Sequence, residues 1–127
     1  MSYRVSESRV PPASAVAWLA AIGAVYAAAG IALSAYAAHV VAGADASRLQ
    51  AAGLFAFGNG IALAALAPVA AGRLNRIALT AIAVGTLLFS GSLVARVALH
   101  ATAMLAPFGG MSMIGGWLLY AIGQWRR

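Results

Sequence analysis

Four long stretches without a charged residue follow one another along the chain. They cover residues 10–44, 49–72, 77–95 and 97–125. A helix needs about 20 mainly apolar residues to cross a hydrocarbon layer about 30 Å thick. Within lipid the backbone must hydrogen-bond to itself, and the strict apolar–polar alternation of a transmembrane barrel strand is missing here. The pattern therefore predicts an all-α fold, an integral membrane four-helix bundle.

Prolines and small polar residues mark where these helices should begin and end. Pro11 and Pro12 cannot lie inside the first helix, and Ser14 is a candidate N-cap. Pro68 should bend the last turn of the second helix, and Pro107 suits a first helical residue. Residues 97–106 form either a loop or an extension of the third helix. We predict a single transmembrane domain, residues 1–127, with spans at about 14–38, 49–70, 75–96 and 107–124.

The arginines predict the orientation of the chain in the membrane. Four spans place both termini on one side, together with six of the eight basic residues, all of which are arginine. These are Arg4, Arg9, Arg73, Arg76, Arg126 and Arg127, whereas Arg48 and Arg96 fall on the other side. Because positively charged loops stay in the cytoplasm, both termini should be cytoplasmic. We expect a multi-pass protein of a bacterial inner (plasma) membrane.

Composition supports the membrane interpretation and excludes several function classes. The chain is 64% hydrophobic and 8% charged, with a mean hydropathy of +0.93. A soluble domain carries about 25% charged residues. A soluble enzyme and a disordered tail are therefore not expected. The arginines are scattered rather than massed on one face, so no nucleic-acid partner is expected either. Since cysteine is absent, no thiolate site or disulfide can form.

Small residues recur at helical spacing within the predicted spans. In lipid, such residues let helix backbones approach closely. The packing candidates are Gly23, Gly30 and Ser34 in the first span, Gly60 in the second, and Gly109 and Gly116 in the fourth. These stripes suit packing within one chain and also packing between copies in a homo-oligomer. A high alanine content could produce part of the pattern by itself.

Ionisable residues inside a membrane are functional candidates, and this chain has few of them. Its only acidic residues, Glu7 and Asp45, fall outside the spans, so no carboxylate can relay protons or act in hydrolysis there. We therefore predict no catalytic residue, no metal site and no cofactor.

The remaining candidates form one possible polar functional cluster, made of His39, Asn59, Arg96 and His100. Arg96 and His100 would share a face if the third helix continued. The alternative for His39, Arg96 and His100 is an ordinary interfacial position at helix ends. The alternative for Asn59 is a structural hydrogen bond to another helix. The expected partners are Ser90, Ser92 and Ser112.

Several short motifs resemble the DUF423 family of small membrane proteins. They are the run Gly-Thr-Leu-Leu-Phe-Ser-Gly-Ser-Leu at 85–93, Ala-Pro-Phe-Gly-Gly at 106–110, Gly-Trp at 116–117 and Ala-Ala-His at 37–39. The resemblance covers about residues 20–125. It implies a four-helix membrane fold and brings no established reaction, substrate or cofactor.

The chain departs from that family pattern mainly in the second helix. Where the family usually has Tyr-Gln…His, this sequence has Phe55-Ala56…Asn59. Val94 and Ala106 also replace the usual Tyr and Thr. Any family activity that used the second-helix histidine would therefore be absent here or would use Asn59 differently.

These observations favour a small, non-enzymatic membrane protein that acts through helix packing with membrane lipid, with a membrane protein partner or with further copies of itself. The alternative is a small oligomeric transporter or channel for an anion or weak acid. In that case the polar residues around His39 would form its mouth. A transporter should show a polar path to Asn59, and a packing protein should show a dry interior.

Overall fold

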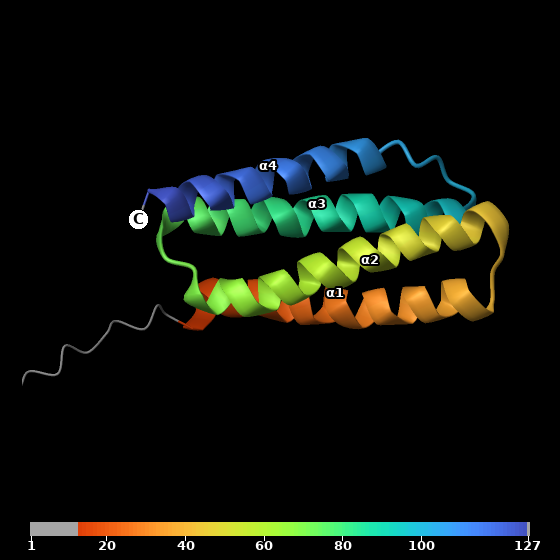
Figure 1. Ribbon diagram of the computed structural model, residues 1–127, viewed down its shortest axis with the longest axis horizontal. Helices are drawn as coiled ribbons and strands as arrows, with labels where there is room; N and C mark the ends of the chain where they lie inside the picture. Colours follow the sequence, from red (N-terminus) through yellow and green to blue (C-terminus); the bar gives the residue numbers. More distant parts are fainter. Residues whose placement is uncertain (1–12, 127) are drawn as a thin grey trace, which may run out of the picture.

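The chain folds into four helices joined by short connections, as a computed structural model of the protein shows (Figure 1). The structure describes residues 13–126. The helices are α1 (Ala13–His39), α2 (Gly43–Leu66), α3 (Gly72–Leu99) and α4 (Ala106–Trp125), with a short 3-10 turn η1 (Ala67–Val69) after α2. The predicted all-α four-helix architecture is confirmed.

The helix ends differ from the predicted ones in informative ways. α1 begins at Ala13, so Ser14 is not the residue that precedes the helix. Pro68 lies in η1, where the chain tightens into a 3-10 turn before leaving the helix. α3 continues to Leu99 and ends at His100, whose φ of 54° is left-handed. The third helix is therefore extended beyond residue 96, and a loop follows.

Three of the helices are long and apolar enough to cross a membrane. They are Ala17–His39, Gly43–Val69 and Gly72–Leu99, all within the described part of the chain. α4, with 20 residues, is not among them. Its length still matches the thickness of the hydrocarbon layer. The chain thus has the helices of a membrane protein.

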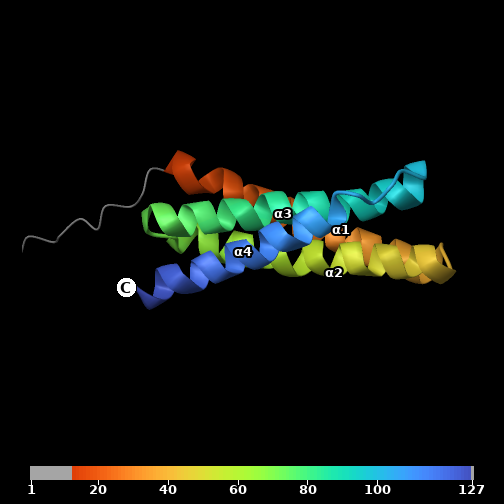
Figure 2. The same cartoon turned by 90° about the horizontal axis from the view of Figure 1, so that it is seen from above.

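The helices are arranged as two hairpins. α1 packs mainly against α2, and α4 packs almost wholly against α3. Contacts between α2 and α3 join the hairpins, and Figure 2 shows α4 crossing obliquely over its neighbours. Because α4 has few neighbours other than α3, its outer face remains uncovered within the chain.

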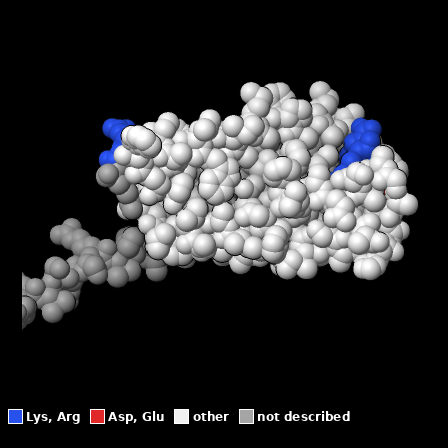
Figure 3. Space-filling view, in the orientation of Figure 1, with Lys and Arg blue, Asp and Glu red and all other residues white. Residues whose placement is uncertain are grey.

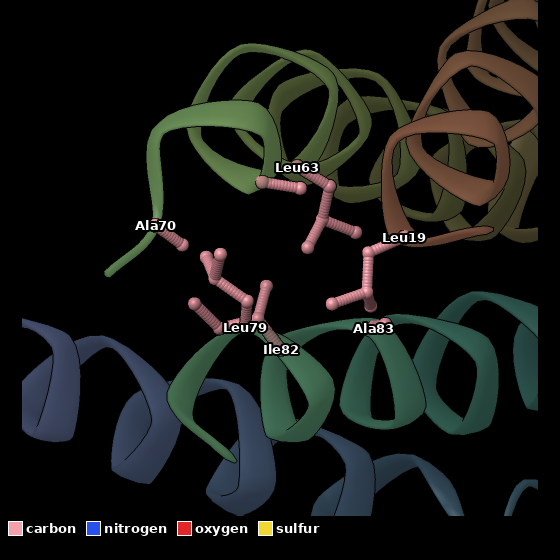
Figure 4. Packing of buried hydrophobic residues seen from close by; sticks show 7 residues of the cluster. Leu19, Leu63, Ala70, Leu79, Ile82 and Ala83 are labelled. Atoms are coloured by element: carbon pink, nitrogen blue, oxygen red, sulfur yellow. The ribbon is translucent and has the colours of Figure 1, made fainter. Parts of the chain in front are cut away.

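A small apolar cluster holds the first three helices together near the end of α2 and the start of α3. Its larger members are Leu19 from α1, Leu63 from α2, and Leu79 and Ile82 from α3, each at most 1% exposed (Figure 4). Many other large apolar side chains point outward. Such a surface is typical of helices solvated by lipid.

Charged side chains gather at the two ends of the molecule. On the face drawn in Figure 3, arginines colour each end, and the length between them carries no charge. α1 begins, α2 ends and α4 ends at one end, which we call the terminal end. The other end, called the loop end, carries the α1–α2 and α3–α4 connections.

Candidate functional site

The α1–α2 interface is built on direct backbone contact between glycines. A Cβ atom placed on Gly23 would lie 2.6 Å from the carbonyl oxygen of Gly60. One placed on Gly30 would lie 2.6 Å from the backbone nitrogen of Phe57, and one on Gly53 would lie 2.7 Å from the Ser34 hydroxyl. Ordinary carbon contacts are about 3.5–4.0 Å long. No larger residue fits at these positions without moving a helix.

The α3–α4 interface also depends on close backbone contact at glycines. A Cβ atom on Gly109 would collide with the backbone of Gly85 and Phe89. A Cβ atom on Gly116 would lie 2.7 Å from the Ile82 side chain. Gly85 in turn meets the backbone of Met113. The small residues singled out from the sequence therefore lie at helix contacts within one chain.

Asn59 is the central polar residue of the membrane-spanning region. Its side chain is 8% exposed, and its Nδ2 donates to the sulfur of Met113 at 3.0 Å. The indole Nε1 of Trp117 donates to Asn59 Oδ1 at 3.1 Å. The expected hydrogen bond to another helix is confirmed, because both partners lie on α4.

The partners expected for Asn59 were wrong. Ser90 donates instead to the carbonyl of Ala52 at 2.8 Å, and Ser112 donates to the carbonyl of Ala81 at 2.9 Å. These serines thus bond the backbone of a neighbouring helix. Asn59 faces the space between α2 and α4, where it meets the Met113 thioether and the Trp117 indole. The sequence alone could not reveal that α4 turns this face toward α2.

A hollow of about 350 Å³ lies beside Asn59, between α2, α3 and α4. Its walls are mostly aromatic and aliphatic. Phe55 and Phe89 meet there edge to face, with ring centroids 4.9 Å apart. The hollow can accept an apolar group and has little to offer a hydrated ion. Polar atoms near it are already used by the bonds to Asn59.

The predicted polar cluster does not assemble into one site. His39 and Arg96 are exposed at the loop end, and so is His100. Within residues 13–126, no hydrogen bond or ion pair joins these three. Asn59 lies roughly 24 Å along α2 from Gly43, at 1.5 Å per residue. Asn59 therefore lies deeper in the molecule than His39, Arg96 and His100.

The helix end explains why Arg96 and His100 do not share a helix face. α3 stops at Leu99, and the left-handed backbone of His100 redirects the chain into the loop. Nearby, Arg48 pairs with Asp45 at 3.0 Å, one turn apart on α2. In the described range, no group of three His, Asp or Glu side chains could hold a metal ion.

The terminal end contains features that the sequence did not single out. Asn75 is 3% exposed and donates from Nδ2 to the carbonyl of Ala71 at 2.9 Å. Its Oδ1 packs against Gly123 and has no partner among the described residues. Trp125 is 90% exposed next to Arg126. A polar residue in the first turn of a predicted span was the available signal for Asn75.

Several residues on which the sequence predictions depend lie outside the described range. These are Glu7 and the arginines Arg4, Arg9 and Arg127, all in residues 1–12 or at 127. For these arginines, the predicted orientation of the chain therefore depends on the sequence alone. Among the described arginines, Arg73, Arg76 and Arg126 belong to the terminal end, and Arg48 and Arg96 belong to the loop end.

Comparison with known proteins gives one match. A family model described as "Protein of unknown function (DUF423)" matches residues 33–110, more than half of the chain. The matched range runs from the last turns of α1 to the start of α4. No curated protein and no solved structure matches the chain.

Proposed function

Since the chain belongs to the DUF423 family, a family of unknown function, its role must be argued from its own geometry, and we propose a non-enzymatic packing function in the membrane. On this proposal the protein crosses a bacterial inner membrane with both termini in the cytoplasm. It acts through its lateral helix faces, on lipid or on partner proteins.

The observation that carries this proposal is the apolar interior, in which the buried polar side chains make hydrogen bonds within the protein. All four buried polar side chains in the described part make hydrogen bonds to protein atoms, and they are Asn59, Asn75, Thr86 and Ser90. The buried side-chain oxygen that has no partner among the described residues, Oδ1 of Asn75, lies at the terminal end. Polar groups that are already paired stabilise helix packing, whereas a transport path needs groups that can exchange partners with a solute.

The transporter alternative gains no specific support from this arrangement. It called for a polar path from the loop end to Asn59, but the hollow beside Asn59 is lined mostly by apolar side chains. The indole and thioether that hold Asn59 would have to move before a solute could reach its amide. A packing role needs no such movement.

Single-cysteine labelling tests the proposed orientation, because the chain has no native cysteine. Thr102→Cys lies in the α3–α4 loop, and Gln124→Cys lies near the end of α4, and both positions are exposed. In intact spheroplasts, a membrane-impermeant maleimide should label residue 102 and spare residue 124 until the membrane is opened. The reverse pattern would contradict cytoplasmic termini.

A flux assay tests the proposed role against the alternative. Purified protein in sealed liposomes should leave chloride and acetate uptake at the level of protein-free liposomes. Uptake that rises with protein and falls in a His39→Ala/His100→Ala variant would refute the packing role in favour of transport. When a polymer extracts the protein in nanodiscs of its native membrane, a lipid or a partner protein should co-purify at a fixed ratio to the chain.

A further inference from the structure

A groove at the terminal end combines positive charge with an apolar floor. It is an open groove with a volume of about 730 Å³. Trp18 and Leu19 of α1 form one wall. Arg73 and Arg76 stand at its end on α3, and Ile77, Ala81 and Val84 continue along the same face of that helix.

The order of these residues along α3 gives the groove a polarity. Arg73 and Arg76 lie one turn apart at the start of the helix, and Val84 lies about 12 Å deeper than Arg76 at 1.5 Å per residue. The hydroxyl of Thr80, between them, is engaged with the carbonyl of Arg76 at 2.8 Å. The groove is therefore cationic at the membrane surface and apolar further in.

The charges around this end have no acidic side chain to balance them in the described range. Asp45 is the only acidic residue between positions 13 and 126, and it pairs with Arg48 at the loop end. The start of α3 adds the positive end of a 28-residue helix dipole, and its N-cap residue, Ala71, supplies no side-chain hydrogen bond. An anion at this position would be favoured by both arginines and by the helix terminus.

We propose that this groove binds an anionic phospholipid, with its phosphate at Arg73 and Arg76 and an acyl chain along Ile77, Ala81 and Val84. Charge complementarity selects a negatively charged headgroup, and the apolar floor selects a lipid over a soluble phosphate. Trp18, with 47% of its surface exposed, lies at the level where indole rings favour the headgroup region. This inference rests on the membrane location proposed above and names the lipid class that the protein contacts.

The other hollows lack this combination. The hollow of about 530 Å³ between α1 and α3, which Tyr26 and Val94 help to line, contains no charged residue. The smaller hollow of about 310 Å³ at the terminal end holds Arg73 and Arg126 but has little apolar wall. Acyl chains of any lipid can occupy the uncharged hollow between α1 and α3. Only the groove beside Trp18 offers both a phosphate partner and a chain path among the cavities described.

Lipid retention measured by native mass spectrometry tests the proposal. The full chain in detergent is given equal amounts of phosphatidylglycerol and phosphatidylcholine with identical acyl chains. Each arginine near an anionic surface contributes roughly a fivefold preference, so Arg73→Gln/Arg76→Gln should lower phosphatidylglycerol retention about 25-fold. Arg96→Gln is the matched control, since Arg96 is an exposed arginine at the other end of the same helix. It should leave retention unchanged.

A second pair of variants tests the apolar floor with both arginines intact. Val84→Trp should fill the inner half of the groove and reduce retention several-fold. Leu87→Trp, on the same helix but outside this groove, should not. Soluble glycerol 3-phosphate at the lipid concentration should not displace the bound phospholipid.

Three results would overturn the proposal. They are unchanged retention in the double arginine variant, an equal loss in Arg96→Gln, and displacement by glycerol 3-phosphate, which would indicate a soluble anion site. The measurement in detergent does not depend on orientation. Failure of the lipid site is therefore separate from failure of the proposed topology, which the cysteine labels report.

Discussion

The glycine contacts between α1 and α2 predict that the same Gly→Ala change has different effects on stability at two positions of α2. Gly58 and Gly60 are two residues apart on α2, and both are far from its ends. A Cβ atom on Gly60 would lie 2.6 Å from both the backbone nitrogen of Ala27 and the carbonyl oxygen of Gly23. A Cβ atom on Gly58 would meet nothing within 4 Å. The same Gly→Ala change therefore adds a methyl group to a closed contact in one case and to open space in the other.

The magnitude follows from the shortage of space. Carbon contacts settle near 3.5–4.0 Å, so α1 and α2 must separate by about 1 Å to admit the methyl group on Gly60. Overpacking of this kind costs about 1–3 kcal/mol. Backbone atoms form the obstacle, and no flexible side chain can relieve it. Gly58→Ala should change the free energy of unfolding by roughly 0 to +1 kcal/mol, because alanine favours the helix.

The assay is reversible unfolding of the purified protein in mixed micelles with increasing denaturing detergent, followed by circular dichroism. We expect Gly60→Ala to be less stable than Gly58→Ala by about 2 kcal/mol, because both variants gain the same helix propensity and only Gly60→Ala carries the cost of overpacking. Equal stability of the two variants, or a lower stability of Gly58→Ala, would contradict the close contact at Gly60. A larger oligomer in Gly60→Ala alone would indicate that the separated helices find another partner.

Three further side chains give independent predictions in the same unfolding assay. Tyr26→Phe removes the hydroxyl that donates to the carbonyl of Ala83 at 2.9 Å and should cost about 0.5–1.5 kcal/mol; an unchanged value would mean that this bond adds nothing. His100→Gly should raise stability by about 1 kcal/mol, because His100 adopts a φ of 54° that glycine adopts without strain; a loss would show that the imidazole itself is needed. Trp117→Phe keeps an aromatic ring but removes the donor to Asn59, and should cost about 0.6–1.7 kcal/mol; in a double-mutant cycle, no coupling with Asn59→Leu would contradict the bond.

The sequence predicted the helices well because charge-free length is a strong signal in a membrane protein. It also marked glycines such as Gly30 and Gly109, since small residues at helical spacing leave a visible stripe. Helix ends were less certain, because Ser14 is a local signal for a helix start, and the helix begins one residue before it. The extension of α3 to Leu99 depended on apolar residues that suit a loop and a helix equally well.

The polar candidates were harder to place, because their roles depend on contacts between distant residues. Asn59 and its partners on α4 are separated by more than 50 positions, and nothing local distinguishes Met113 from Ser112 as a partner. His39, Arg96 and His100 were grouped because they share one end of the molecule. Side chains that lie at the same end of the molecule are not necessarily in contact. Asn75 passed unnoticed because its burial arises only when α4 packs over the start of α3.

The departure from the family pattern at Asn59 suggests a substitution that the structure should tolerate. The family resemblance places a histidine in this part of the second helix, where this chain has Asn59. A neutral imidazole can accept the Trp117 indole proton with one nitrogen and donate with the other, as the amide does. The adjoining hollow of about 350 Å³ offers room for the larger ring. Asn59→His should therefore lose less than 1 kcal/mol and preserve the bond to Trp117, whereas Asn59→Leu leaves the indole N–H unpaired and should lose about 1–3 kcal/mol. Tryptophan fluorescence should shift in Asn59→Leu and stay near the wild-type wavelength in Asn59→His. If both variants lose the same stability, the amide of Asn59 acts through its shape rather than through its hydrogen bonds.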